Sequence, residues 1–199
     1  MTATPWQEMV RLLDGRAYSV VSHEPREETP HRVAFGPGLT DAEVAGVERR
    51  FEFTFPPDLR QFLQTALPLG PKFPNWRRES QALLRSWMNA PRDELLRQVE
   101  NGGFWHDDWG ARPEALPEAL RVASAALLAV PRLIPIYGRR LIPVEPCVAG
   151  NPVFSIHDAD VAYCARDLED CLRREFRLSG RRPWNEPEPQ IRFWSSLAR

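Results

Sequence analysis

The segments LIPIYGRRLIP, residues 133–143, and GNPVFSIHDADVAY, residues 150–163, decide the fold of this chain. They contain four short apolar stretches, separated by glycine, proline, asparagine and aspartate residues that favour turns. A helical pattern follows over residues 166–177. The arrangement predicts a strand meander that leads into a closing helix. We therefore expect an α+β fold with a mostly antiparallel sheet flanked by helices.

Upstream of the meander, apolar residues recur at helical spacing in several segments. The expected helices begin near Pro5, Asp41, Pro57, Glu79 and Pro117, and we expect Pro91 to break the fourth of them. Thr40 and Glu43 form a capping-box pattern at the start of the second helix. Strands over residues 17–22 and 32–35 are expected to join the meander in one sheet, with loops over residues 23–30 and 68–76.

The chain has 199 residues, which is enough for one domain to bury a core without disulfides. We expect a single domain over residues 1–178 and a tail over residues 179–199. The tail contains Ile191, Phe193 and Trp194. Because bulky apolar side chains are seldom left in water together, the tail is expected to pack back on the domain.

Composition limits the partners and the location of the protein. A formal net charge of −1 gives no overall field that would attract nucleic acid or an anionic membrane. No segment has the apolar length of a membrane span, and the N-terminus has no secretory signal pattern. Three cysteines without a CxxC pair argue against a disulfide framework and a zinc site. We expect a cytoplasmic protein without cofactor or metal, and the sequence leaves its oligomeric state open.

Several motifs of the chain resemble the SUKH superfamily, the Smi/Knr-type cell-wall regulators of yeast and their bacterial relatives. The resemblance begins with LTDAE (39–43) and FPPDLRQFL (55–63), where Leu59 replaces the aromatic residue of many members. A longer bacterial subgroup is indicated by NWR (75–77), FW (104–105), WG (109–110), RP (112–113), PRLIPIY (131–137), GNPVFS (150–155) and DVAY (160–163). The likeness covers residues 39–177. It implies a mixed sheet flanked by helices, no established catalytic residues and, in many bacterial members, immunity against a toxin.

Two kinds of side chain are candidates for contact with a protein partner. Large aromatic residues with neighbouring arginines are typical anchors of protein interfaces. Acidic residues at the turn and closing helix could instead steer a basic partner, such as a nuclease toxin. The predicted partner-binding residues are Trp76, Arg77, Trp105, Asp107, Trp109, Tyr137, Arg140, Asp158, Asp160 and Asp170. The competing interpretations are that the tryptophans belong to the core and that the acidic residues, with Asp167, serve the helix start.

Other side chains of the same segments allow chemical alternatives. His106, Asp107 and Asp108 could hold a metal ion, but neighbours in an extended segment point to opposite faces. Ser155 and His157 could share one face of a strand, without an oxyanion device around them. A pocket that gathers His106, Asp107, Tyr137 and His157 would favour an enzyme or a small-ligand binder.

The sequence therefore predicts a non-enzymatic protein-binding module, in the first place an immunity protein. The alternatives are a regulatory scaffold of the cell-wall type, and a ligand-binding protein or enzyme that uses residues 105–109. One pair of substitutions is expected to separate core from surface. Phe62→Ala should cost about 3 to 5 kcal/mol, whereas Asp170→Asn should leave stability nearly unchanged and alter partner association only.

Overall fold

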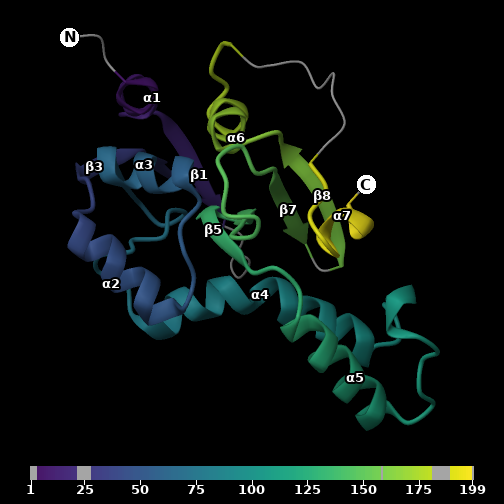
Figure 1. Ribbon diagram of the computed structural model, residues 1–199. Helices are drawn as coiled ribbons and strands as arrows, with labels where there is room; N and C mark the ends of the chain where they lie inside the picture. Colours follow the sequence, from purple (N-terminus) through teal and green to yellow (C-terminus); the bar gives the residue numbers. More distant parts are fainter. Residues whose placement is uncertain (1–3, 22–27, 158, 181–188, 199) are drawn as a thin grey trace.

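A computed structural model describes residues 4–21, 28–157, 159–180 and 189–198 (Figure 1). The N-terminal half comprises α1 (Pro5–Leu13), β1 (Ala17–Val21), β2 (Glu28–Arg32), β3 (Ala34–Pro37), α2 (Asp41–Phe51), α3 (Pro57–Thr65) and β4 (Ala66–Leu69). The C-terminal half comprises α4 (Gln81–Glu100), the short 3-10 helix η1 (Asp107–Trp109), α5 (Leu116–Leu128), β5 (Leu133–Tyr137), β6 (Arg140–Pro143), β7 (Val153–His157), β8 (Asp160–Ala165), α6 (Leu168–Glu175) and α7 (Trp194–Leu197). The fold is α+β, as the sequence predicts.

The predicted meander forms as an antiparallel sheet in the order β5-β6-β7-β8. The expectation of one common sheet is wrong, because in the described part of the chain β1 pairs only with β2, and β3 pairs only with β4. Pro30, Pro37 and Pro68 lie in these short strands and have no N–H to donate, which limits pairing on a second side. Strand β2 includes residues 28–30 of the loop predicted over 23–30, whose other residues lie outside the described part of the chain, and β4 includes residues 68 and 69 of the loop predicted over 68–76.

The capping box at α2 is confirmed. The Thr40 hydroxyl oxygen accepts from the Glu43 N–H at 3.2 Å, and a Glu43 carboxylate oxygen accepts from the Thr40 N–H at 2.8 Å. Two helical N–H groups that would otherwise lack partners are satisfied in this way. Helix α3 begins at Pro57, as expected, and buries Leu59, Phe62 and Leu63.

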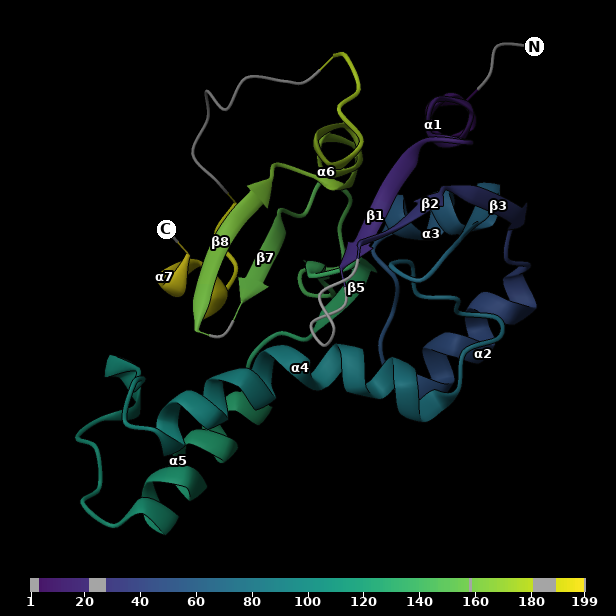
Figure 2. The ribbon, with the colours of Figure 1, turned by 180° about the vertical axis from the view of Figure 1, so that it is seen from behind.

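Helix α4 continues through Pro91 over 20 residues, so the predicted break is wrong. A proline inside a helix costs about 3 kcal/mol through a lost hydrogen bond and a clash with the preceding turn. Burial of Leu84 on one side of Pro91, and of Leu95 and Val99 on the other, offsets this cost by holding both halves on one axis. The helix runs across the lower part of the molecule in these views and lies beside α5 at its far end (Figures 1 and 2).

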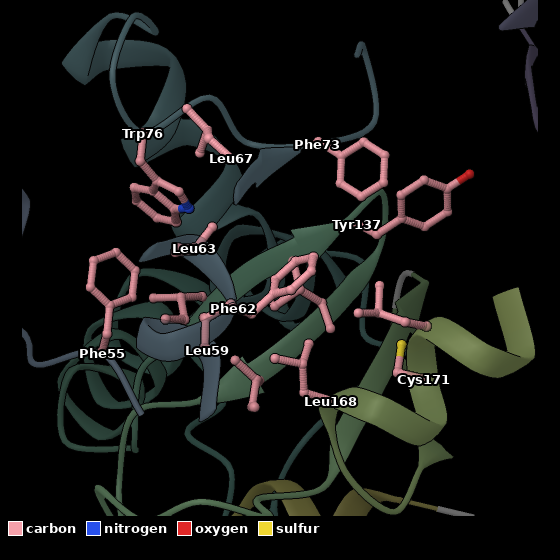
Figure 3. Packing of buried hydrophobic residues seen from close by; sticks show 14 of the residues in the cluster. Phe55, Leu59, Phe62, Leu63, Leu67, Phe73, Trp76, Tyr137, Leu168 and Cys171 are labelled. Atoms are coloured by element: carbon pink, nitrogen blue, oxygen red, sulfur yellow. The ribbon is translucent and has the colours of Figure 1, made fainter. Parts of the chain in front are cut away.

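The apolar side chains form two clusters. The larger one joins the N-terminal half to β5, β6 and α6, and contains a group of aromatic rings (Figure 3). The smaller one lies among α4, α5 and the strands β5 to β8, and it includes Ile191 and Trp194 of the C-terminal segment. These two side chains are 2% and 1% exposed, and the Trp194 ring N–H donates to the Pro131 carbonyl at 2.7 Å. The last helix therefore lies against the domain next to β8 (Figure 2).

Candidate functional site

The ten residues predicted to contact a partner do not lie together on one accessible surface. Trp76, Tyr137 and Asp170 are only 2%, 5% and 3% exposed, respectively. A partner cannot contact these side chains substantially in this conformation. Asp158 lies outside the described residues.

Trp76 and Tyr137 belong to the aromatic core. The ring of Trp76 meets Phe55 edge to face, with ring centroids 5.3 Å apart, and it also contacts the rings of Phe51 and Phe53. Tyr137 packs on Phe73 and Phe176, and its hydroxyl points away from the other labelled side chains (Figure 3). Burial raises the pKa of the Tyr137 phenol, and the charge of Glu175 adds to the effect. Of the two interpretations of these aromatic residues, the structure supports the core.

The two predicted arginine anchors make internal contacts instead. Arg77 forms an ion pair with Glu43 and donates to the Pro37 and Gly38 carbonyls, both at 2.9 Å. Arg140 forms an ion pair with Glu175 and donates to the Ser155 hydroxyl. Because each guanidinium group is paired with a carboxylate of the chain, both join elements of the fold to one another.

The Arg77–Glu43 pair predicts a specific pH dependence. Hydrogen bonds from Arg77, with further help from Thr40, lower the pKa of Glu43 from 4.5 to about 2. A carboxylate with a lowered folded-state pKa stabilises the fold above its ordinary pKa, and this contribution is lost as the pH falls through the folded value. We expect the stability difference between wild type and Glu43→Gln to shrink between pH 4.5 and 2. Denaturant unfolding at each pH measures it, and on an Arg77→Gln background the difference should be smaller, with the Thr40 hydrogen bonds to Glu43 still contributing.

Trp105 and Trp109 belong to a small aromatic group at η1, next to Asp107. The Trp105 ring N–H donates to the Gly110 carbonyl at 2.7 Å, and Trp109 stacks on Phe193 of the C-terminal segment. His106 is 9% exposed and shares a hydrogen bond with the Ser196 hydroxyl at 2.9 Å. Asp107 and Asp108 are exposed. Within the described residues, no three acidic, histidine or cysteine side chains are placed to share a metal ion.

The residues of the hypothetical catalytic pocket are also separated. His106 packs on Phe193, with ring centroids 4.9 Å apart, whereas Tyr137 belongs to the other apolar cluster. His157 lies at the end of β7, and the Ser155 hydroxyl accepts from Arg140. Ser155 is therefore engaged with a guanidinium group instead of standing as a nucleophile beside a base.

The acidic residues around α6 serve the helix itself. Asp167 is the N-cap and accepts from the Asp170 N–H at 2.8 Å. Asp170 pairs with Arg174 at 2.7 Å, and Glu169 pairs with Arg173 at 2.9 Å. These arginines balance much of the negative charge that was expected to steer a basic partner. Asp160 remains exposed on β8.

The sequence interpretation missed a pocket of about 190 Å³ between α2, α4 and the connection from α5 to β5. Helix α4 supplies residues at positions i, i+3, i+4 and i+7, so they occupy one helix face. Arg132 approaches from the connection before β5. The lining residues are Phe51, Arg85, Met88, Asn89, Arg92, Leu128, Arg132 and Leu133, and this set contains three arginines and no acidic residue.

Each of the three guanidinium groups is held by neutral acceptors. Arg85 donates to the Arg50 carbonyl at 3.1 Å and lies over the Phe51 ring. Arg132 donates to the Phe51 carbonyl at 2.7 Å, at the end of α2. Arg92 donates to the Val130 carbonyl at 3.0 Å. Carbonyl groups fix the side chains but do not neutralise their charge.

The pocket is therefore electropositive. Among the described residues, no carboxylate lies within 4 Å of Arg85 or Arg92, and Arg132 has only a 4.0 Å contact with the exposed side chain of Glu52. Burial lowers the pKa of Arg92, and the like charge of Arg132 lowers it further, while the Asp93 carboxylate opposes the shift to a smaller extent. An anion placed between these groups would relieve their repulsion.

A wider groove of about 680 Å³ adjoins the pocket and shares Arg92, Leu128 and Arg132 with it. Its charge is mixed, because Glu48, Glu52 and Glu145 line it together with these arginines and Arg49. Leu128 stands at the junction of the two hollows and is 75% exposed. An exposed leucine beside uncompensated arginines is a combination found in protein-binding surfaces.

Comparisons with known proteins do not assign this surface to a family. The chain matches no family model, no curated protein sequence and no solved structure. In the described part of the chain, none of the helices has both the length and the apolar character that crossing a bilayer requires.

Proposed function

We propose that this protein is a non-enzymatic protein-binding module that engages its partner on the face formed by the wide groove, the arginine pocket and Leu128. The observation that carries the proposal is the position of Leu128 at the junction of the two hollows, with most of its apolar surface in water. Burial of a leucine side chain in a complex contributes about 1.5 to 3 kcal/mol. The arginines around it add directional hydrogen bonds.

The class of binding module is proposed from the sequence. The resemblance to the SUKH superfamily favours an immunity protein that acts in the cytoplasm and neutralises a toxin. The pairing of acidic residues at α6 with arginines favours a partner other than a highly basic one. A toxin recognised through acidic residues on its own surface agrees with both observations.

Site-specific photo-crosslinking in the native host tests the binding face. A photoreactive residue at position 128 is expected to give one adduct of defined mass. The matched control is position 116, an exposed leucine at the other end of the same helix, which should give none. Adducts at both positions, or at neither, would contradict the proposed face.

Co-expression tests the class of partner. The captured protein, produced without this chain, is expected to stop the growth of host cells, and wild-type protein is expected to restore growth. The Leu128→Asp variant should protect poorly, because a buried charge opposes docking of an apolar patch. A captured protein without toxicity would overturn the immunity role and leave the binding function standing.

A further inference from the structure

The pocket between α2, α4 and the α5–β5 connection has the chemistry of a site for one carboxylate. We propose that Arg85, Arg92 and Arg132 bind an aspartate or glutamate side chain of the protein partner. This inference rests on the proposed function, and it names the group on the partner that the pocket recognises.

The size of the pocket limits the ligand. A volume of about 190 Å³ is smaller than the roughly 300 to 1,000 Å³ of sites that enclose drug-sized molecules. It suits a side chain or a small ion. Leu128 and two of the arginines also line the wide groove, so a side chain that enters the pocket would come from a chain lying in the groove.

The arginines are arranged in advance for an anion. The Phe51 ring lies 5.5 Å from the Arg85 guanidinium carbon, and the carbonyls of residues 51 and 130 fix Arg132 and Arg92. Each guanidinium has five N–H donors, of which these contacts use only a part. Because these side chains are already ordered, binding of a carboxylate would cost little of their conformational entropy.

The surroundings favour a carboxylate on a protein over a nucleic-acid backbone. A phosphate chain would have to continue along the wide groove, where Glu48, Glu52 and Glu145 would repel it. A single acidic side chain avoids this repulsion. The remainder of a protein segment can place apolar atoms on Leu128 and polar atoms against the glutamates.

Nuclear magnetic resonance of the entire 199-residue chain tests the inference without a known partner. The probes are the peptide GEGLG with blocked ends, its neutral twin GQGLG, and inorganic phosphate. We expect GEGLG to shift the Nε–Hε signals of the three arginines with a dissociation constant on the order of 1 mM, and GQGLG to have no effect. Phosphate should bind more weakly than GEGLG.

Two arginine variants test whether GEGLG binds in the pocket. Arg92→Gln should weaken GEGLG binding about tenfold, because it removes charge-assisted hydrogen bonds. The matched control is Arg97→Gln, since Arg97 is an exposed arginine of α4 that lines neither the pocket nor the wide groove, and it should bind as wild type does. If Arg92→Gln does not fold, Arg85→Gln, at an exposed position, serves in its place with the same expected loss.

Different results would overturn different parts of the account. Equal binding of GEGLG and GQGLG, or tight binding of phosphate alone, would overturn the carboxylate site. A partner captured through position 128 whose affinity is unchanged by Arg92→Gln would also overturn it and leave the binding face intact. No capture at position 128, with GEGLG binding intact, would overturn the proposed function instead.

Discussion

Replacement of Trp76 by alanine is expected to lower the free energy of unfolding by about 3 to 5 kcal/mol. The side chain is 2% exposed and meets the rings of Phe51, Phe53 and Phe55 at steep angles. Alanine would leave a large cavity in the aromatic group, which the surrounding rings cannot fill. Urea unfolding monitored by far-UV circular dichroism measures the loss.

Two controls give this prediction its specificity. Trp105→Ala, at a half-buried ring of the η1 segment, should cost clearly less. Trp76→Phe should also cost less than Trp76→Ala, because the Trp76 ring N–H is buried without an acceptor among the described residues. If Trp76→Ala is as stable as wild type, the ring does not lie in the core.

Replacement of Asp170 by asparagine is expected to cost about 2 kcal/mol through its charged hydrogen bonds. The Asp170 carboxylate accepts from Arg174 at 2.7 Å and from the Arg166 N–H at 3.2 Å, and its side chain is 2% exposed. An asparagine has no charge for Arg174 and places two amide hydrogens where few acceptors exist. The sequence interpretation, with Asp170 on the surface, predicted almost no change.

Asp160→Asn is the matched control, because Asp160 is an exposed carboxylate on β8. Its effect should stay within about 0.5 kcal/mol. Guanidinium chloride unfolding of both variants distinguishes the two locations. If Asp170→Asn is as stable as wild type and Asp160→Asn is destabilised, the Asp170 carboxylate is not buried.

Local patterns in the sequence were sufficient to predict many of the helices and strands. The capping box of Thr40 and Glu43, the start of α3 at Pro57 and the four strands of the meander depend on residues close to one another in the chain. Such signals act before any tertiary contact forms, so they can be recognised without the fold.

Elements that depend on distant contacts were predicted poorly. The continuity of α4 through Pro91 requires apolar partners on other elements, and the pairing of β3 with β4 joins residues about 30 positions apart. The burial of Trp76 likewise depends on rings supplied by α2 and the segment after it. Composition alone does not distinguish a core tryptophan from one on a binding surface.

The arginine pocket could have been found only in part. Arg85 and Arg92 lie seven positions apart, but they share a helix face only because α4 continues through Pro91, where the sequence predicted a break. Arg132 joins them from 40 positions further along, and its role depends on how α5 returns beside α4. The arginine-rich composition gave no reason to select these three from the others, because most arginines here are paired or solvated.

Hydrogen–deuterium exchange of the protein, alone and bound to the partner captured through position 128, tests the central claim most directly. A complex formed on the proposed face should slow amide exchange in residues 85–92 and 127–133, which contribute most of the pocket lining. Exchange in residues 105–109 and 153–165 should be unchanged. Slowed exchange confined to those two segments, with residues 85–92 unaffected, would contradict the account.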